Sequence, residues 1–200
     1  MIESAYSAGL ISQSFWFIET KKVLKLVYEG KTEDEIKRLC IEENLFGASK
    51  EYRAKRIYGY IWNRVKHLDN KLVELFCESD LATQKLINLI AILRSDRLFF
   101  EFVYEVYREK IILGVPTLED SDVNIFFGNK ETQNESIAKW TDATKRKLRS
   151  CYFNYLTDAN LITLVNKERT VTPPILDVAV ERYLTAVGDS VIVKAITGVN

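Results

Sequence analysis

The stretch KEYRAKRIYGYIWNRVKHL, residues 50–68, shows the pattern that governs most of the chain. Its apolar residues recur three and four positions apart, which is the spacing of one face of an α-helix. This apolar stripe contains Ala54, Ile57, Tyr58, Ile61, Val65 and Leu68. A second stripe of the same period is basic, aromatic and amide-bearing, and it contains Arg53, Arg56, Tyr60, Asn63, Arg64 and His67. We therefore expect a helix capped by Ser49, with the apolar stripe in the core and the polar stripe exposed.

The same periodicity continues on both sides of this helix and predicts a mainly helical protein. Thr32 and Glu35 have the spacing of a capping box, which marks the start of a helix. Asp69 and Asp80 stand where N-caps of two further helices are expected. A helix over about 96–112 is apolar on several sides, so we expect it to be central to the core. Further helices are expected at about 14–30, 135–158, 175–187 and after Asp189.

One segment departs from the helical pattern. The β-branched run Leu161–Val165 is followed by the polar residues Asn166–Arg169 and then by a second β-branched run, which indicates a small β-hairpin with a four-residue turn. Pro173 and Pro174 end the hairpin and start the next helix. A basic helix followed by a hairpin with a basic tip is the order of a winged helix. The predicted fold class is therefore all-α with one small β-hairpin, built from helix-turn-helix-like and winged-helix-like units.

Residues 113–139 have the weakest pattern, with glycine, proline and polar residues around one short apolar piece. We interpret this stretch as a boundary. The expected organisation is an N-terminal helical part, 1–113, which contains the helix-turn-helix-like basic helix. A connecting segment, 114–134, precedes a C-terminal winged-helix-like part, 135–200.

The overall charge balance excludes a globally basic nucleic-acid binder, because 28 lysines and arginines are matched by 28 acids among 200 residues. The charges are nevertheless segregated along the chain. Basic residues dominate 50–68 and 139–149, whereas acids dominate 69–80 and 119–135. A neutral total is therefore compatible with local basic faces.

Scarce residues exclude several classes of function. There is one histidine, His67, and the three cysteines Cys40, Cys77 and Cys151 lie far apart, so neither a structural zinc site nor a disulfide framework is expected. No phosphate-binding glycine motif is present. The most apolar run, Leu86–Leu93, is far shorter than the roughly 20 residues of a membrane span. We expect a cytoplasmic protein with buried thiols that has no cofactor, metal or membrane contact and is not an enzyme.

The polar stripe of the 50–68 helix has the chemistry of a DNA-contacting surface. Arginine forks bind phosphates or guanine, and asparagine reads adenine. A second basic group lies on the helix that precedes the hairpin and at the hairpin tip. The expected nucleic-acid-binding residues are Lys50, Arg53, Arg56, Tyr60, Asn63, Arg64, Lys145, Arg146, Arg149, Lys167 and Arg169.

The chain resembles the BrxA family, the small A component of BREX bacteriophage-defence systems. The resemblance is carried by an opening Tyr6-Ser7-Ala8-Gly9-Leu10-Ile11 with Glu19 and Tyr28-Glu29-Gly30, by Asn44 to Arg64, and by Leu156-x-x-Ala159-x-Leu161-Ile162 with Val171-x-Pro173-Pro174. It covers essentially the whole chain apart from residues 113–139. It implies an all-helical, non-enzymatic accessory protein of a multi-gene defence system that binds double-stranded DNA.

Three functions follow from these observations. The leading one is a DNA-binding accessory component of a BREX-type system. The first alternative is a scaffold whose segregated charges dock other BREX system proteins without direct DNA binding. The second alternative is an enzyme with a dispersed site, which a pocket lined by converging carboxylates would favour.

Overall fold

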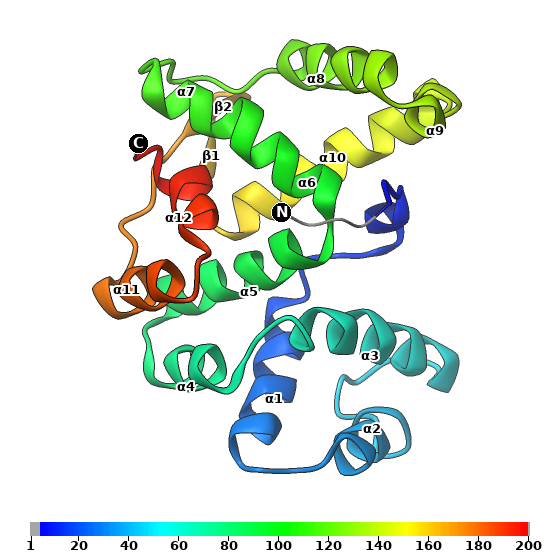
Figure 1. The fold of residues 1–200 in the computed structure, drawn as a ribbon. Helices are drawn as coiled ribbons and strands as arrows, with labels where there is room; N and C mark the ends of the chain where they lie inside the picture. The colour runs from blue at the N-terminus through cyan, green and yellow to red at the C-terminus, as the bar shows by residue number, and fades with distance from the viewer. Residues whose placement is uncertain (1–4, 200) are drawn as a thin grey trace. The chain divides into compact units, whose positions relative to one another are not determined.

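The structure is a computed structural model that describes residues 5–199. Its contacts gather into two units (Figure 1). The N-terminal unit is Phe15–Ser95. The C-terminal unit runs from Asp96 to the end of the described chain and includes the described residues before Phe15. Each unit contains its own set of buried apolar side chains.

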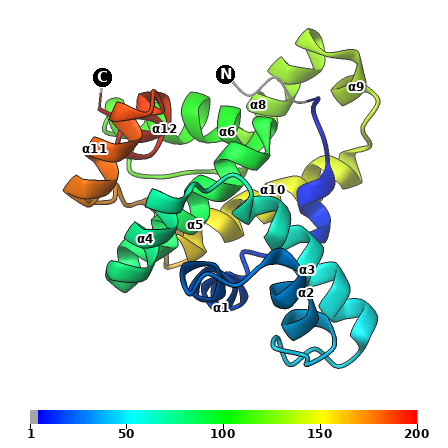
Figure 2. The same cartoon turned by 60° about the horizontal axis from the view of Figure 1, so that its bottom comes forward.

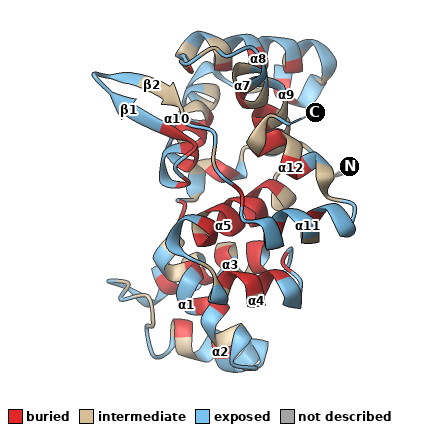
Figure 3. Ribbon diagram, turned by 90° about the vertical axis from the view of Figure 1, so that its left-hand side faces the viewer, coloured by how far each residue is buried: buried red, intermediate tan, exposed pale blue. Residues whose placement is uncertain are grey.

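The N-terminal unit is entirely helical in its regular structure. Helix α2 lies against α3, and α1 lies against α4 (Figure 2). Helix α5 contacts α1, α3 and α4, and every side chain from Leu86 to Leu93 is buried (Figure 3), which is typical of a helix at the centre of a core. The helices are α1 (Phe17–Tyr28), α2 (Glu33–Ile41), α3 (Glu51–Val65), α4 (Asn70–Glu78) and α5 (Leu81–Ser95).

The C-terminal unit begins with one continuous helical rod, made of α6 (Arg97–Phe102), a π-helical turn (Val103–Tyr107) and α7 (Arg108–Ile112). The core is aromatic: the ring of Tyr152 lies against three phenylalanine rings at centroid distances between 5.0 and 6.1 Å. The elements that follow the rod are α8 (Asp120–Gln133), α9 (Glu135–Ala138), α10 (Asp142–Asp158), β1 (Ile162–Val165), β2 (Glu168–Val171), α11 (Val178–Ala186) and α12 (Ser190–Thr197). A short 3-10 turn, η1 (Gly9–Ser12), packs on α10.

The hairpin is antiparallel, with Ile162 opposite Val171. Its turn consists of Asn166 and Lys167, which both have positive φ angles, 51° and 68°. This is the geometry of a tight two-residue turn that matches the twist of the strands. The predicted four-residue turn is therefore too long, because Glu168 and Arg169 belong to β2.

The free edge of β2 is paired with the chain just before α8. The amide of Leu118 donates to the carbonyl of Arg169 (2.9 Å), and the amide of Val171 donates to the carbonyl of Pro116 (2.7 Å). The hairpin is therefore joined by a short third extended segment, and only the edge of β1 remains without such a neighbour in the described chain.

The predicted fold class, mainly helical with one small hairpin, is confirmed. The capping box of Thr32 and Glu35 forms, and the carboxylate of Asp69 caps α4. The predicted cap of α3 is wrong. The N-cap is Lys50, and the Ser49 hydroxyl, one position too early, instead accepts a hydrogen bond from the Arg53 guanidinium (3.3 Å).

The two units divide after Ser14 and after Ser95, whereas the sequence pattern predicts boundaries near residues 113 and 134. The rod 97–112 groups with the C-terminal unit, and the predicted connecting segment 114–134 contains helix α8. The apolar side chains of α8 are bunched near Phe126 and Phe127, so its periodicity is weak although both are buried. The helix predicted over 135–158 is two helices, because the Thr141 hydroxyl caps α10.

Within residues 5–199 no helix is long and apolar enough to cross a membrane. In the same range no group of three or more histidine, cysteine or acidic side chains is arranged to hold a metal ion. The three cysteines are free thiols, of which Cys40 is buried and the other two are half-buried. Burial raises the pKa of the Cys40 thiol to about 11, so this thiol is protonated at neutral pH.

The hydroxyls of Thr32 and Ser49 were both expected to cap a helix, but only the Thr32 hydroxyl does so. We expect Thr32→Ala to lower the free energy of unfolding by about 1 kcal/mol, because the amide of Glu35 loses its acceptor. Ser49→Ala should change it by less than about 0.5 kcal/mol. Urea denaturation of both variants measures the difference, and equal losses would contradict the capping assignment.

Candidate nucleic-acid interface

The start of α3 carries four basic side chains and one acid, Glu51. Lys50, Arg53, Lys55 and Arg56 are all exposed, and within the described residues none of them forms an ion pair. Arg53 and Arg56 lie one turn apart on the same helix face. The polar stripe predicted from the sequence therefore starts with two uncompensated guanidinium groups.

The stripe continues through Tyr60 and Asn63, which follow the two arginines on the same side of α3. Asn63 is exposed, and Tyr60 is partly exposed. The Tyr60 ring stacks on the ring of Trp16, with centroids 5.8 Å apart and planes inclined by 20°. Four residues of the predicted stripe thus lie on one side of α3: Arg53, Arg56, Tyr60 and Asn63.

The predicted exposure of Arg64 is wrong, because this residue is only 1% exposed. The two stripes of α3 adjoin at Arg64, and the chain that leads into α1 covers the helix there. One guanidinium nitrogen of Arg64 donates to the carbonyl of Phe15 (3.0 Å), and the side-chain amide of Asn88 donates to the same carbonyl (3.1 Å). The guanidinium also lies 5.6 Å from the centroid of the Trp16 ring. Arg64 is therefore a structural residue and cannot contact DNA in this conformation.

Trp16 adopts a left-handed backbone conformation, with φ 46° and ψ 45°. For a bulky residue this region costs about 1–2 kcal/mol. The hydrogen bonds that hold the carbonyl of Phe15 restrain the backbone directly before it, and the Trp16 carbonyl accepts the first hydrogen bond of α1 from Thr20 (2.9 Å). The surrounding contacts thus hold the Trp16 ring against Tyr60.

The second predicted group, on α10 and the hairpin, is largely neutralised. Lys145 pairs with Glu131 (2.6 Å), Arg149 pairs with Asp120 (3.1 Å), and Arg169 pairs with the same Asp120 (3.0 Å). Hydrogen bonds to Glu131 and Asp142 raise the pKa of Lys145. The acidic segment 119–135 is separate in sequence from the basic residues of α10. In the structure this segment forms α8, whose acids pair with those basic residues.

Arg169 also differs from its predicted place at the hairpin tip. It lies within β2, and its guanidinium lies 3.8 Å from the centroid of the Phe153 ring. Lys167 is the basic residue at the tip and is exposed. On α10, Arg146 and Lys147 are exposed and line a hollow of about 580 Å³ beside η1. Of the second predicted group, Arg146 and Lys167 are thus exposed without an acidic partner in the described chain, and Lys147, which was not among the predicted binding residues, lies beside Arg146.

The order of α2, a connection and α3 is that of a helix-turn-helix. The connection spans residues 42–50, which is longer than the turn of about three or four residues that is usual in this motif. Sequence reasoning missed Trp16 as a member of the site. No local signal marks this residue, because its partner Tyr60 lies on another helix and the pairing depends on the fold.

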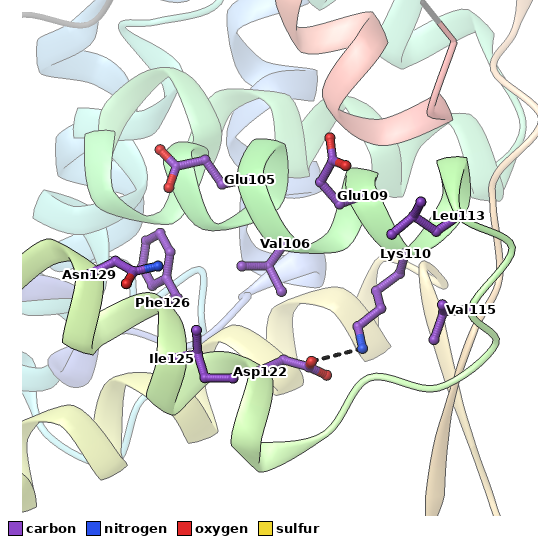
Figure 4. A pocket seen from close by; sticks show the side chains of 10 residues that line it. All are labelled: Glu105, Val106, Glu109, Lys110, Leu113, Val115, Asp122, Ile125, Phe126 and Asn129. Atoms are coloured by element: carbon purple, nitrogen blue, oxygen red, sulfur yellow. Dashed lines mark ion pairs between the residues drawn. The ribbon is translucent and has the colours of Figure 1, made fainter.

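A separate cavity of about 310 Å³ lies between the rod and α8 in the C-terminal unit (Figure 4). Three carboxylates line it, but they do not converge. Asp122 pairs with Lys110 (2.8 Å), whereas the carboxylates of Glu105 and Glu109 point away from Asp122. Among the described lining residues there is thus no facing pair of carboxylates of the kind that acid–base chemistry uses.

Known proteins are similar to this chain over most of its length. A family model described as BrxA matches residues 4–188. A protein named "BREX protein BrxA" from Bacillus cereus (strain H3081.97) is 36% identical over 196 residues, which is 98% of each chain. Another "BREX protein BrxA", from Paramagnetospirillum magneticum (strain ATCC 700264 / AMB-1), is 24% identical over 165 residues, which is 82% of each chain.

A solved structure is also similar. The crystal structure of an uncharacterized protein from Magnetospirillum magneticum matches with a TM-score of 0.83 over 98% of this chain and 100% of that chain. The sequence identity is 19%, so this similarity concerns the fold alone.

The buried position of Arg64 leads to a stability prediction. Arg64→Ala removes a large buried side chain and one of the donors to the Phe15 carbonyl, so we expect the free energy of unfolding to fall by about 2–4 kcal/mol. Arg56→Ala, on the exposed face of the same helix, should cost less than about 0.5 kcal/mol. Chemical denaturation of both variants measures this, and a loss for Arg64→Ala as small as that for Arg56→Ala would refute the anchoring role.

Proposed function

Because this chain belongs to the BrxA family of BREX phage-defence systems, we propose that it acts there as a non-enzymatic component that binds double-stranded DNA. The observation that carries the proposal is the exposed basic group at the start of α3, which has no ion-pair partners in the described chain. Exposed positive charges without acidic partners create a local positive potential, which attracts anions. The phosphate backbone of DNA is such an anion.

The side chains along the stripe have complementary roles in this proposal. Arg53 and Arg56 contact phosphates, because a guanidinium presents paired donors that match phosphate oxygens. Asn63 lies two turns further along the same face, where its amide can reach a base edge. Phosphate contacts fix the position of the helix on the duplex, and base contacts supply any sequence preference.

The C-terminal unit supplies a second, weaker contact surface. Its order is a helical rod, a short extended segment at 116–118, α8, α10 and the hairpin, and this order is consistent with a winged helix. In that arrangement α10 is the helix presented to DNA and the hairpin is the wing. Arg146, Lys147 and Lys167 are then the contacting residues, because the other basic side chains are held by acids of α8.

A docking role for other BREX proteins is the second candidate. The observation that favours it is the pair of large apolar side chains at the cavity beside α8: Leu113 is 70% exposed and Ile125 is 63% exposed. Exposed apolar side chains next to a hollow are typical of protein-binding surfaces. The two candidates are distinguished by whether the isolated protein binds a DNA duplex in a salt-dependent way.

The proposal predicts the salt dependence of DNA binding. Replacing Arg53 and Arg56 with alanine should weaken duplex binding and flatten the log–log salt slope by up to about two units, because each lost phosphate contact removes about 0.9 of slope. The control is Lys21→Ala with Lys25→Ala, which makes the same charge change on α1. Fluorescence anisotropy with a labelled duplex over a salt series measures both. Unchanged affinity and slope in a folded Arg53/Arg56 variant would remove α3 from the interface.

The C-terminal surface leads to a separate prediction. Replacing Arg146 and Lys147 with alanine should weaken duplex binding less than the α3 double variant does, because few uncompensated charges remain around them. Replacing Arg149 should change affinity least, since Asp120 already neutralises it. The same anisotropy series ranks the three. If the Arg149 variant causes the largest loss, the ion pairs with α8 must open on binding and the ranking is wrong.

A further inference from the structure

The stacked pair of Trp16 and Tyr60 is partly exposed on the surface of the N-terminal unit. Both rings are only partly buried, although each belongs to a residue type that is normally placed in the core or at an interface. Trp16 also has a left-handed backbone conformation, which is unfavourable for this residue. Strain of this kind persists only where the surroundings enforce it, and it is concentrated at functional sites.

The surroundings do enforce it. The buried guanidinium of Arg64 and the amide of Asn88 both bind the carbonyl of Phe15, directly before Trp16. The aromatic pair is therefore held in place in the absence of any ligand. A prearranged surface loses little conformational entropy when a flat ligand stacks on it.

We propose that the Tyr60–Trp16 stack is a binding site for an unpaired base of DNA. The inference rests on the proposed DNA binding and specifies which state of DNA the site prefers. The aromatic pair would supply the face on which the base stacks. Arg56 and Arg53, one and two turns before Tyr60 on the same face of α3, would hold the phosphates that flank the base.

The chemistry selects an unpaired base over a paired one. Inside a duplex both faces of each base are covered by neighbouring bases, so an aromatic side chain reaches a face when the base leaves the stack or when the base step is opened. The cost of leaving is smallest where the base is already mismatched or single-stranded. Stacking on an aromatic side chain is also tolerant of sequence, because every base has a π face. The site therefore favours distorted DNA and leaves sequence choice to other contacts.

Arg64 has a positioning role in this proposal. Its guanidinium lies 5.6 Å from the centroid of the Trp16 ring and holds the backbone at Phe15, but it is buried and does not contact the base. This explains why a residue with the spacing of the DNA-binding stripe is found in the interior.

The test compares two labelled DNAs of the same length and salt conditions: a perfect duplex and the same duplex with a central mismatched bubble. We expect the wild-type protein to bind the bubble about tenfold more tightly, which is within the range for stacking of one base. Tyr60→Leu should remove this preference, so that the ratio of the two affinities falls to about one. Tyr60→Phe keeps the ring and should keep the preference.

The matched control is Tyr52→Leu, which removes a 68% exposed tyrosine from the same helix outside the aromatic pair and should leave the preference intact. Tyr60→Gln is a second non-aromatic variant in case Tyr60→Leu does not fold. Equal binding of both DNAs by the wild type, or a preference that survives in the non-aromatic variants, would overturn the stacking site and leave duplex binding standing. Failure to bind either DNA would overturn the proposed function as well.

Discussion

The carbonyl of Phe15 is the acceptor on which the N-terminal unit depends. It receives hydrogen bonds from Arg64 of α3 and from Asn88 of α5, so a single backbone group joins the start of α1 to two other helices. A buried guanidinium is costly unless its donors are satisfied, and this contact offsets part of that cost. The same contact fixes Trp16 beside Tyr60, so the interior of the unit determines the shape of its polar surface.

The two basic groups of the molecule differ in whether their charges are paired with acids. On α10 the lysine and arginine side chains meet acids of α8, and Asp120 alone serves both Arg149 and Arg169. On α3 the first two turns have no such partners in the described chain. Partly buried ion pairs hold their charges in place, whereas uncompensated exposed charges remain available to a polyanion. This difference is why α3 is the primary surface in the proposed function and α10 the secondary one.

The sequence predicted the features that depend on local rules. The capping box at Thr32, the cap at Asp69 and the hairpin all follow from neighbouring residues, and all three are present. Periodicity also identified α3 and placed Arg53 and Arg56 on its exposed side. Periodicity could not predict that Arg64 is buried. Arg64 lies where the polar stripe meets the apolar stripe, and the helix pattern does not show which other part of the chain covers that position.

Long-range contacts account for the remaining differences. Helix α8 was not predicted because its apolar residues are bunched and followed by Gly128, so it is stabilised by packing in the C-terminal unit rather than by its pattern. The neutralisation of α10 and the pairing of Trp16 with Tyr60 join residues far apart in sequence, and no local signal marks either. Ion pairs and ring contacts of this kind become visible only in the folded chain.

In the proposed function, DNA lies along the exposed face of α3. Photo-cross-linking of the protein to a bromodeoxyuridine-substituted DNA, followed by mass spectrometry of the linked peptides, tests this directly. We expect cross-links within residues 50–63 and at Trp16, with at most weaker ones on α10 and the hairpin tip. Cross-links confined to the α7–α8 surface or to other parts of the chain would contradict it.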